Sequence, residues 1–367
     1  MTTRAILPPQ RTSWAPVAAL GLAMSVVTSE MTILAVTLPG MGAELGVSAA
    51  ATAWVLLAYA LPPAAVSVPA GRWADGADVR AVFALAMIGL GPASVLVAFA
   101  PTFGLVVVGR LLQGIAGALA VAAYMPMISG GVRQEQRGRA IGFVITIMAI
   151  GATVGMPLGG LVAEVFTWRE VVLMKIPLAL IVLWIGLRSI PRTPDRGLPR
   201  PSVVLIHEAL LLGGAVAALL VALDEVDGQP LVAAAPGVAA VAFGVWWAPL
   251  TASGPVTALT RGRSYAGTKI ALFTTTFTGN PAISTAPLVG TNAGSEGVAG
   301  GVGMTVRTIA MTVAPAVTAA AWTMAGAGSA GFRAGFVVVT ATAGLGLLVR
   351  LLPASPWAVR PAAEGSR

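Results

Sequence analysis

The chain has no cysteine and a single histidine, His207, among its 367 residues. Without thiols it can form neither disulfides nor thiolate metal sites, and one imidazole leaves little material for a histidine-based site. An enzyme needs converging acid–base groups or metal ligands, whereas the acids here are few and scattered. The sequence therefore predicts a protein that is not an enzyme, with no catalytic residues, no metal and no cofactor.

Charged residues are also scarce, at 10% of the chain, whereas soluble domains carry about 25%. Hydrophobic residues make up 57%, and the mean hydropathy is +0.88. Apolar runs recur at about the 20-residue length that an α-helix needs to cross a bilayer. We therefore predict an all-α, polytopic helical membrane protein. Its spans should lie near residues 14–38, 51–70, 82–100, 103–126, 140–163, 171–190, 205–223, 231–250, 265–290, 302–325 and 332–352.

The basic residues explain the net charge of +8 without a nucleic-acid partner, because most of them lie at the N-terminus and in alternate loops. These residues are Arg4, Arg11, Arg72, Arg80, Arg133, Arg137, Arg139, Arg188, Arg192, Arg196, Arg200, Arg261, Arg263 and Lys269. The other loops are mostly acidic, with Glu44, Glu164, Glu170, Asp224, Glu225 and Asp227 beside Arg169. The positive-inside rule then places the N-terminus in the cytoplasm. The apolar run from Trp14 is too long for a signal-peptide core, so we expect a retained first span.

A proline-rich linker at 192–201 separates six predicted spans from the rest of the chain. We predict four parts and about ten to eleven spans in all. The parts are an N-terminal six-helix bundle over 1–190, a cytoplasmic linker over 191–204, two linking helices over 205–250, and a shortened C-terminal half over 251–367.

Two charged residues lie well inside predicted spans. Arg110 is in the middle of an apolar stretch, next to Gln113 and Gly114. A charge within a membrane is costly, so Arg110 should face the bundle interior or a wet cavity. Glu30 lies about two-thirds along the first span. A carboxylate in that environment can take up a proton near neutral pH. The alternative is a hydrated position near the outer interface.

The fifth span has glycines at 151, 155 and 159, which recur every four residues and so share one helix face. Such a face lets two helices approach closely. Pro157 removes a backbone hydrogen bond and can bend the helix there. Plain packing is the simplest role for these residues, and a bend at a packed interface is also what a rocking transporter needs.

Other charged residues have two readings each. Asp75 follows the second span, where it could pair with basic loop residues or cap the next helix. Arg307 is either a second charge within the membrane or the snorkelling start of a helix. We expect Lys175 and Lys269 to snorkel to the membrane surface, and His207 and Glu208 to lie at the interface.

Four motifs occur in the order and spacing of a known family. They are EMTI at 30–33, GRWAD at 71–75 leading to Arg80, GRLLQG at 109–114, and GATVGMPLGG at 151–160 with Trp168-Arg169 behind it. Together they resemble the major facilitator superfamily, and within it the fourteen-helix drug:proton antiporter branch. The resemblance implies a secondary transporter of the plasma membrane that exports small, drug-like compounds in exchange for protons.

The same resemblance implies roles for individual residues. Glu30 and Arg110 would couple transport to protons. Gly71, Asp75 and Arg80 would form the gating loop, and the packing and bending residues would be Gln113, Gly114, Gly151, Gly155, Pro157 and Gly159. The chain departs from the family pattern at Ala35, Gly76 and Asp78, and Pro157 comes one position late.

The C-terminal half is similar to the family with a part missing. Residues 279–307 resemble the passage from its twelfth to its thirteenth helix, whereas 261–277 resemble the approach to its ninth. Most of about three or four helices would be absent, and 265–290 would form a buried re-entrant hairpin that leaves the C-terminus in the cytoplasm. The alternative function is a shortened membrane protein that does not transport, or that needs a partner chain to complete its bundle.

Overall fold

The computed structural model describes residues 12–193, 197–225 and 337. In these residues the chain is helical and has no strand. The α-helices are α1 (Trp14–Leu45), α2 (Ala49–Asp75), α3 (Val79–Ala98), α4 (Phe103–Gly131), α5 (Arg137–Val165), α6 (Trp168–Ser189) and α7 (Val203–Glu225), with a short 3-10 helix η1 (Gln134–Gln136) before α5. Each of the first seven predicted spans matches one of these helices, whereas the spans predicted from 231 onward lie outside the described residues apart from Val337.

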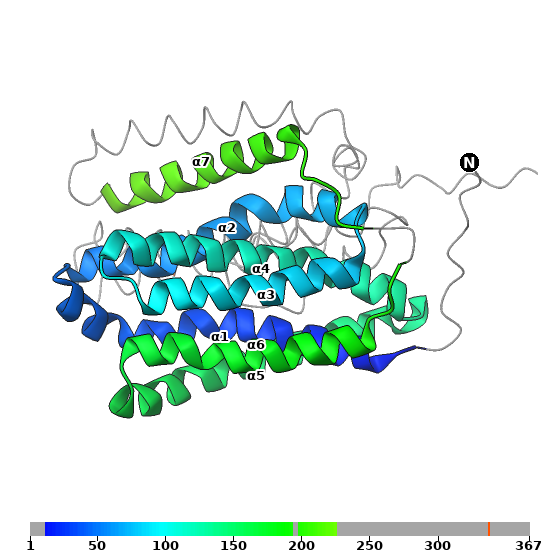
Figure 1. Ribbon diagram of the computed structural model, residues 1–367, viewed down its shortest axis with the longest axis horizontal. Coiled ribbons are helices and arrows are strands. Elements are labelled where there is room, and N and C mark those ends of the chain that lie inside the picture. Colours follow the sequence, from blue (N-terminus) through cyan, green and yellow to red (C-terminus); the bar gives the residue numbers. More distant parts are fainter. Residues whose placement is uncertain (1–11, 194–196, 226–336, 338–367) are drawn as a thin grey trace, which may run out of the picture. The chain divides into compact units, whose positions relative to one another are not determined.

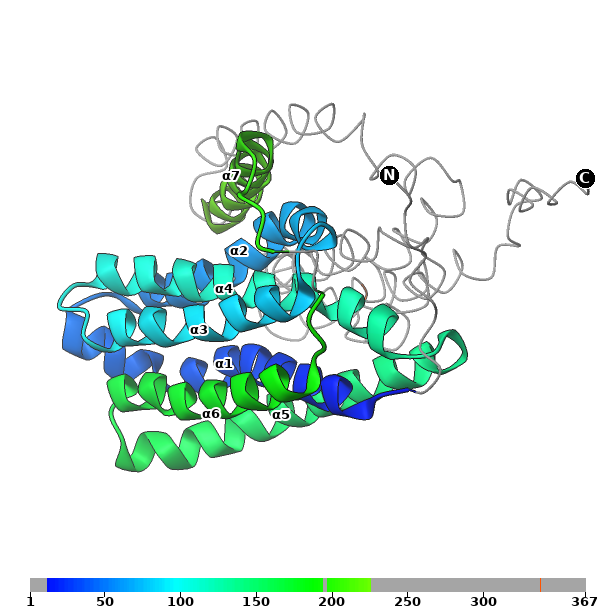
Figure 2. The same cartoon turned by 45° about the vertical axis from the view of Figure 1, so that its right-hand side comes forward.

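The six helices α1–α6 form two groups of three, which Figures 1 and 2 show from two directions. In one group α4 packs along α2 and α3, and in the other α1 packs along α5 and α6. The groups meet mainly where α3 packs on α6 and where α1 packs on α2 and α4. The described residues up to Val216 belong to one compact unit, whereas the end of α7, Ala217–Glu225, belongs to a second one.

Local sequence fixes where several helices begin and end. Gly46 ends α1 in the left-handed conformation, at φ 66°, which favours glycine. Thr167 and Glu170 form a capping box at the start of α6. We considered Asp75 as a cap for the third helix, but the cap of α3 is Asp78, whose side chain accepts a hydrogen bond from the backbone nitrogen of Arg80. Asp75 is instead the last residue of α2.

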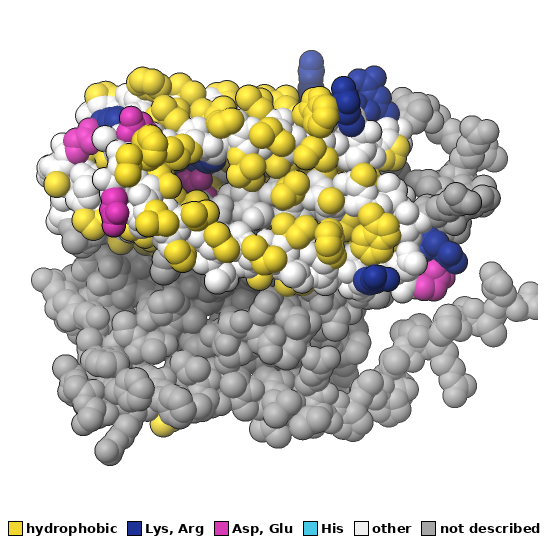
Figure 3. Space-filling model, turned by 90° about the horizontal axis from the view of Figure 1, so that it is seen from below, with side chains coloured by type: hydrophobic (Ala, Val, Ile, Leu, Met, Phe, Trp, Pro, Cys, Tyr) yellow, Lys and Arg dark blue, Asp and Glu magenta, His cyan; other side chains and the backbone are white. Residues whose placement is uncertain are grey.

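Five of the described helices are long and apolar enough to cross a membrane, and α2 makes a sixth if its two segments form one span. Those segments, Ala51–Ser67 and Pro69–Asp75, meet at an angle of 51°. Pro69 accounts for the break because its ring removes a backbone donor. Helix α5, in contrast, continues through Pro157. Figure 3 shows the apolar middle of one face of the bundle, with charged side chains gathered toward both ends, so these helices make a multi-pass membrane protein.

The glycine face of α5 packs directly against α1. A Cβ added at Gly155 would lie 2.5 Å from Oγ1 of Thr32, and one at Gly159 would lie 3.0 Å from Cα of Ile33. At Gly151 the nearest atom is Oγ of Ser25, at 1.8 Å. At Gly159 the neighbouring atoms are backbone, whereas at Gly151 and Gly155 they are side-chain hydroxyls, and the small residues let the two helices pack closely along this face.

Candidate functional site

Arg110 is the largest fully buried side chain among the described residues. Its Nε donates a hydrogen bond to the backbone oxygen of Val55 at 3.1 Å, and its Nη1 donates to Oε1 of Gln113 at 2.8 Å. The same Nη1 forms an ion pair with Oε1 of Glu30. The guanidinium carbon lies 4.4 Å from the centre of the Tyr59 ring, within the range of a cation–π interaction. The structure thus places Arg110 in the bundle interior, as its cost in lipid predicts.

Glu30 and Lys175 complete a buried ion cluster with Arg110. Glu30, on α1, is 8% exposed, and Lys175, on α6, is 9% exposed. The Nζ of Lys175 lies 2.5 Å from Oε1 of Glu30, so two cations contact one carboxylate oxygen. Lys175 does not snorkel, contrary to our expectation, because its helix position directs it toward α1. We call Glu30, Arg110 and Lys175 the Glu30 cluster.

The Glu30 cluster connects the two groups of helices. Glu30 and Lys175 come from the group of α1, α5 and α6, whereas Arg110 comes from the group of α2, α3 and α4. A movement of one group against the other would therefore pull on the Arg110–Glu30 pair. Among the described residues, this ion pair and the hydrogen bond from the Tyr59 hydroxyl to the backbone oxygen of Val27 are buried polar contacts between the two groups.

Polar side chains behind Arg110 hold it in place. Nε2 of Gln113 donates to Oγ of Ser94 at 3.1 Å, and that hydroxyl donates to the backbone oxygen of Leu90. The Tyr59 hydroxyl donates to the backbone oxygen of Val27 at 2.7 Å. Gly114 lets α4 approach α2, because a Cβ there would lie 2.5 Å from the backbone oxygen of Tyr59. This packing orients the guanidinium toward Glu30.

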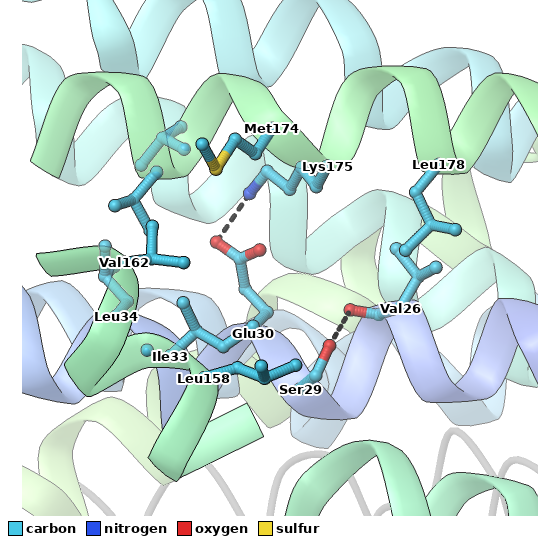
Figure 4. Close-up of a pocket in the computed structure, with 13 residues that line it drawn as sticks. Val26, Ser29, Glu30, Ile33, Leu34, Leu158, Val162, Met174, Lys175 and Leu178 are labelled. Atoms are coloured by element: carbon cyan, nitrogen blue, oxygen red, sulfur yellow. Dashed lines mark hydrogen bonds and ion pairs between the residues drawn. The ribbon is translucent and has the colours of Figure 1, made fainter. Parts of the chain in front are cut away.

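A cavity of about 200 Å³ adjoins the Glu30 cluster between α1, α5 and α6. Figure 4 shows Glu30 and Lys175 pointing toward each other at one side of it. The rest of its wall is largely apolar and includes Ile33, Leu158, Val162, Met174 and Leu178. Charged groups at the edge of an apolar cavity are what a transport or binding site needs.

Two further ion pairs lie nearer the ends of the bundle. Nη1 of Arg72 lies 2.5 Å from Oε1 of Glu208, which is fully buried. Our expectation of an interfacial Glu208 is therefore wrong, because α7 directs this residue toward α2. Of the predicted gating residues, Gly71 is buried near the end of α2, and Arg80, in the first turn of α3, donates to the backbone oxygen of Ile190 at 3.5 Å.

At the opposite end, Arg169 ties three helices together. Its Nε and Nη2 bind Oε1 of Glu44 at 2.9 and 2.8 Å, and its Nη1 donates to the backbone oxygens of Ala98 and Ala100. Nε1 of Trp168 donates to the other oxygen of Glu44 at 2.6 Å. The Trp-Arg pair was part of the sequence motif, but its partner Glu44 was not predicted. Arg307 and the stretch 265–290 lie outside the described residues.

The family follows from a match to most of the chain. The model of the Major Facilitator Superfamily matches residues 19–343. The chain belongs to the major facilitator superfamily. Members of this superfamily are transporters rather than enzymes.

Several relatives in this superfamily are named for drug resistance. The chain is 34% identical over 229 residues to the puromycin resistance protein pur8 of Streptomyces alboniger, which covers 61% of this chain and 45% of that protein. It is 30% identical over 203 residues to the multidrug efflux pump LfrA of Mycolicibacterium smegmatis, or 54% and 40% of the two chains. The chain thus spans about half the length of the curated relatives it matches.

A solved structure shares the fold. The human organic anion transporter MFSD10 aligns with a TM-score of 0.54 over 93% of this chain and 99% of that one. The sequence identity is 14%, so this similarity concerns the fold alone.

Proposed function

We propose that this major facilitator protein is a secondary transporter of the plasma membrane that exports small, drug-like compounds in exchange for protons. The Glu30 cluster carries the proposal, because a carboxylate that binds two cations inside a membrane protein is a group through which protonation can act on helix positions. The names of the relatives and the basic loops support export and a cytoplasmic N-terminus.

The proposed coupling follows from the charges of the Glu30 cluster. A proton bound to Glu30 would neutralise the carboxylate and leave Arg110 and Lys175 as two buried cations without their acid. An uncompensated buried charge costs several kcal/mol. The protonated state would therefore favour an arrangement in which the two helix groups separate and water reaches the cations. Glu30 and Arg110 are the proton-coupling pair in this proposal, with Lys175 as a third member.

Other predicted residues would support that movement. The close packing of α1 on Gly151, Gly155 and Gly159 keeps the group of α1, α5 and α6 together as it moves. Arg80 and the end of α2, with Gly71 and Asp75, would close the cytoplasmic side through contacts to the end of α6. Arg307, in the other half of the sequence, remains a candidate for a second charge in the pathway.

The function is tested in everted membrane vesicles. With an imposed proton gradient, vesicles that contain this chain should accumulate at least one of two fluorescent drug-like dyes, one cationic and one anionic, and a protonophore should abolish the accumulation. Vesicles from cells without the chain are the control. Accumulation no greater than in that control would contradict the proposal and support the alternative, a membrane protein that does not transport alone or needs a partner chain.

Arg110→Lys should separate folding from function. Lysine keeps the charge but not the planar group that contacts Val55, Glu30 and Gln113 at once. We expect the variant to reach the membrane at nearly the level of the parent, but to accumulate dye about tenfold more slowly or worse. A loss of about 1.4 kcal/mol of stabilisation from these contacts corresponds to a tenfold lower rate. Vesicle uptake per amount of immunodetected protein measures this. Parent-level uptake by Arg110→Ala would show that Arg110 is not needed.

A further inference from the structure

The cavity beside the Glu30 cluster lies in a gap between two helices. Helices α5 and α6 both pack along α1 but make few contacts with each other. Three apolar side chains that border the cavity are about half exposed: Leu158 at 49%, Met174 at 41% and Leu178 at 45%. In a membrane protein, exposed apolar side chains on such helices face the hydrocarbon. The cavity is thus reached from the bilayer, and Figure 3 shows a hollow with acidic and basic groups in an otherwise apolar face.

The charge at the inner side of this cavity is positive. The Glu30 cluster contains one carboxylate and two cations, of which Arg110 is always charged. Nη2 of Arg110 is buried and has no hydrogen-bond partner among the described residues. Glu30 and Lys175 are the two charged residues among the described ones that border the cavity. A single ammonium has three donors, and Lys175 uses one of them on Glu30.

We propose that this cavity binds small monoanions with an apolar body, such as an aromatic carboxylate, which enter from the bilayer and pair with Lys175. The anion balances the excess charge of the Glu30 cluster. Its apolar body contacts Leu158, Met174 and Leu178. The Glu30 carboxylate lies on the same side, but its charge is already offset by two cations. The cavity volume of about 200 Å³ is below the range of about 300–1,000 Å³ that is typical of ligand pockets, which suits a ligand as small as one substituted ring.

This inference adds a ligand class to the proposed function and shares Glu30 and Lys175 with it. Binding can be measured without a proton gradient, so its failure is distinct from a failure of transport. The probes are benzoate, benzamide and benzamidine, which have nearly the same shape but carry negative, zero and positive charge. Titration calorimetry on the full chain in neutral detergent should show benzoate binding about tenfold tighter than either of the others, because its carboxylate pairs with an ammonium that is already buried.

Variants locate the site. Lys175→Met should remove the preference for benzoate, and Lys175→Arg should retain it. Leu158→Trp fills the cavity without changing charge and should abolish binding, whereas Leu161→Trp should not, because Leu161 is on the same helix, is 63% exposed and does not border the cavity. Equal binding of the three probes, no benzoate binding at millimolar concentrations, or unchanged benzoate binding by the folded Leu158→Trp variant would each overturn the proposal.

Discussion

Replacing Glu30 with glutamine should reduce proton-driven dye accumulation to the level of vesicles without the protein. Glutamine has nearly the shape of glutamate, but its amide neither binds nor releases a proton at the pH of the vesicle assay. It also leaves Lys175 and Arg110 without the carboxylate that both contact. We therefore expect loss of exchange together with a lower melting temperature, since an unpaired buried charge is strongly destabilising.

A second substitution separates these two effects. Lys175→Met in the Glu30→Gln background removes one of the stranded cations and returns the charge of the site to that of the parent. The double variant should regain much of the melting temperature in detergent while it remains inactive in vesicles. Glu135→Gln is the matched control, because Glu135 lies in the short helix η1 with a side chain that is 72% exposed. Proton-dependent accumulation by Glu30→Gln at the parent level would refute a role for Glu30 in coupling.

Within the described residues, the sequence is sufficient to place the helices and two of the three charged residues of the Glu30 cluster. Arg110 and Glu30 could be predicted because a charge within a long apolar run is rare and must avoid lipid. The glycine face of α5 was visible because its period of four residues is unambiguous. Each of these features lies within a single helix, so hydropathy and residue spacing along that helix are enough to predict it.

The partner of Glu30 could not be found in this way. Lys175 is near the start of α6, where a long cationic side chain can equally reach the membrane surface. Its direction depends on the face that α6 turns toward α1. The buried side of α6, which packs on α3 as well as on α1, contains Val172, Lys175, Ala179, Val182 and Gly186 at helical spacing. Small residues at 179 and 186 hint at this face, but α6 is apolar on all sides, so its sequence alone does not distinguish packing from lipid contact.

The same limit explains the errors at the bundle ends. Glu208 comes only a few residues after the linker, so its position in the sequence predicts that it contacts water at the membrane interface. In the structure it is instead buried against Arg72. Glu44 and Arg169 are far apart in the sequence and join through the packing of α1 on α6. Ion pairs between helices depend on tertiary packing, which a single sequence without an alignment does not contain.

Gly159→Leu should disrupt the contact of α1 with α5 and lower the stability of the fold. A Cβ at this position would lie 3.0 Å from Cα and 3.2 Å from the carbonyl oxygen of Ile33. These are backbone atoms, so no side-chain rotation can relieve the contact, and α1 and α5 must separate. Ile33 also borders the cavity and is three residues from Glu30, so the separation would disturb the Glu30 cluster as well.

Gly160 provides the matched control for this substitution. It is the next residue on α5, and a Cβ there would meet no atom within 4 Å. Gly160→Leu should leave the melting temperature of the detergent-purified chain nearly unchanged, whereas Gly159→Leu should lower it clearly, in line with an overpacking cost of about 1–3 kcal/mol. Equal melting temperatures for the two variants would contradict the close packing of α1 on the glycine face, and with it the view that α1 and α5 move as one body during transport.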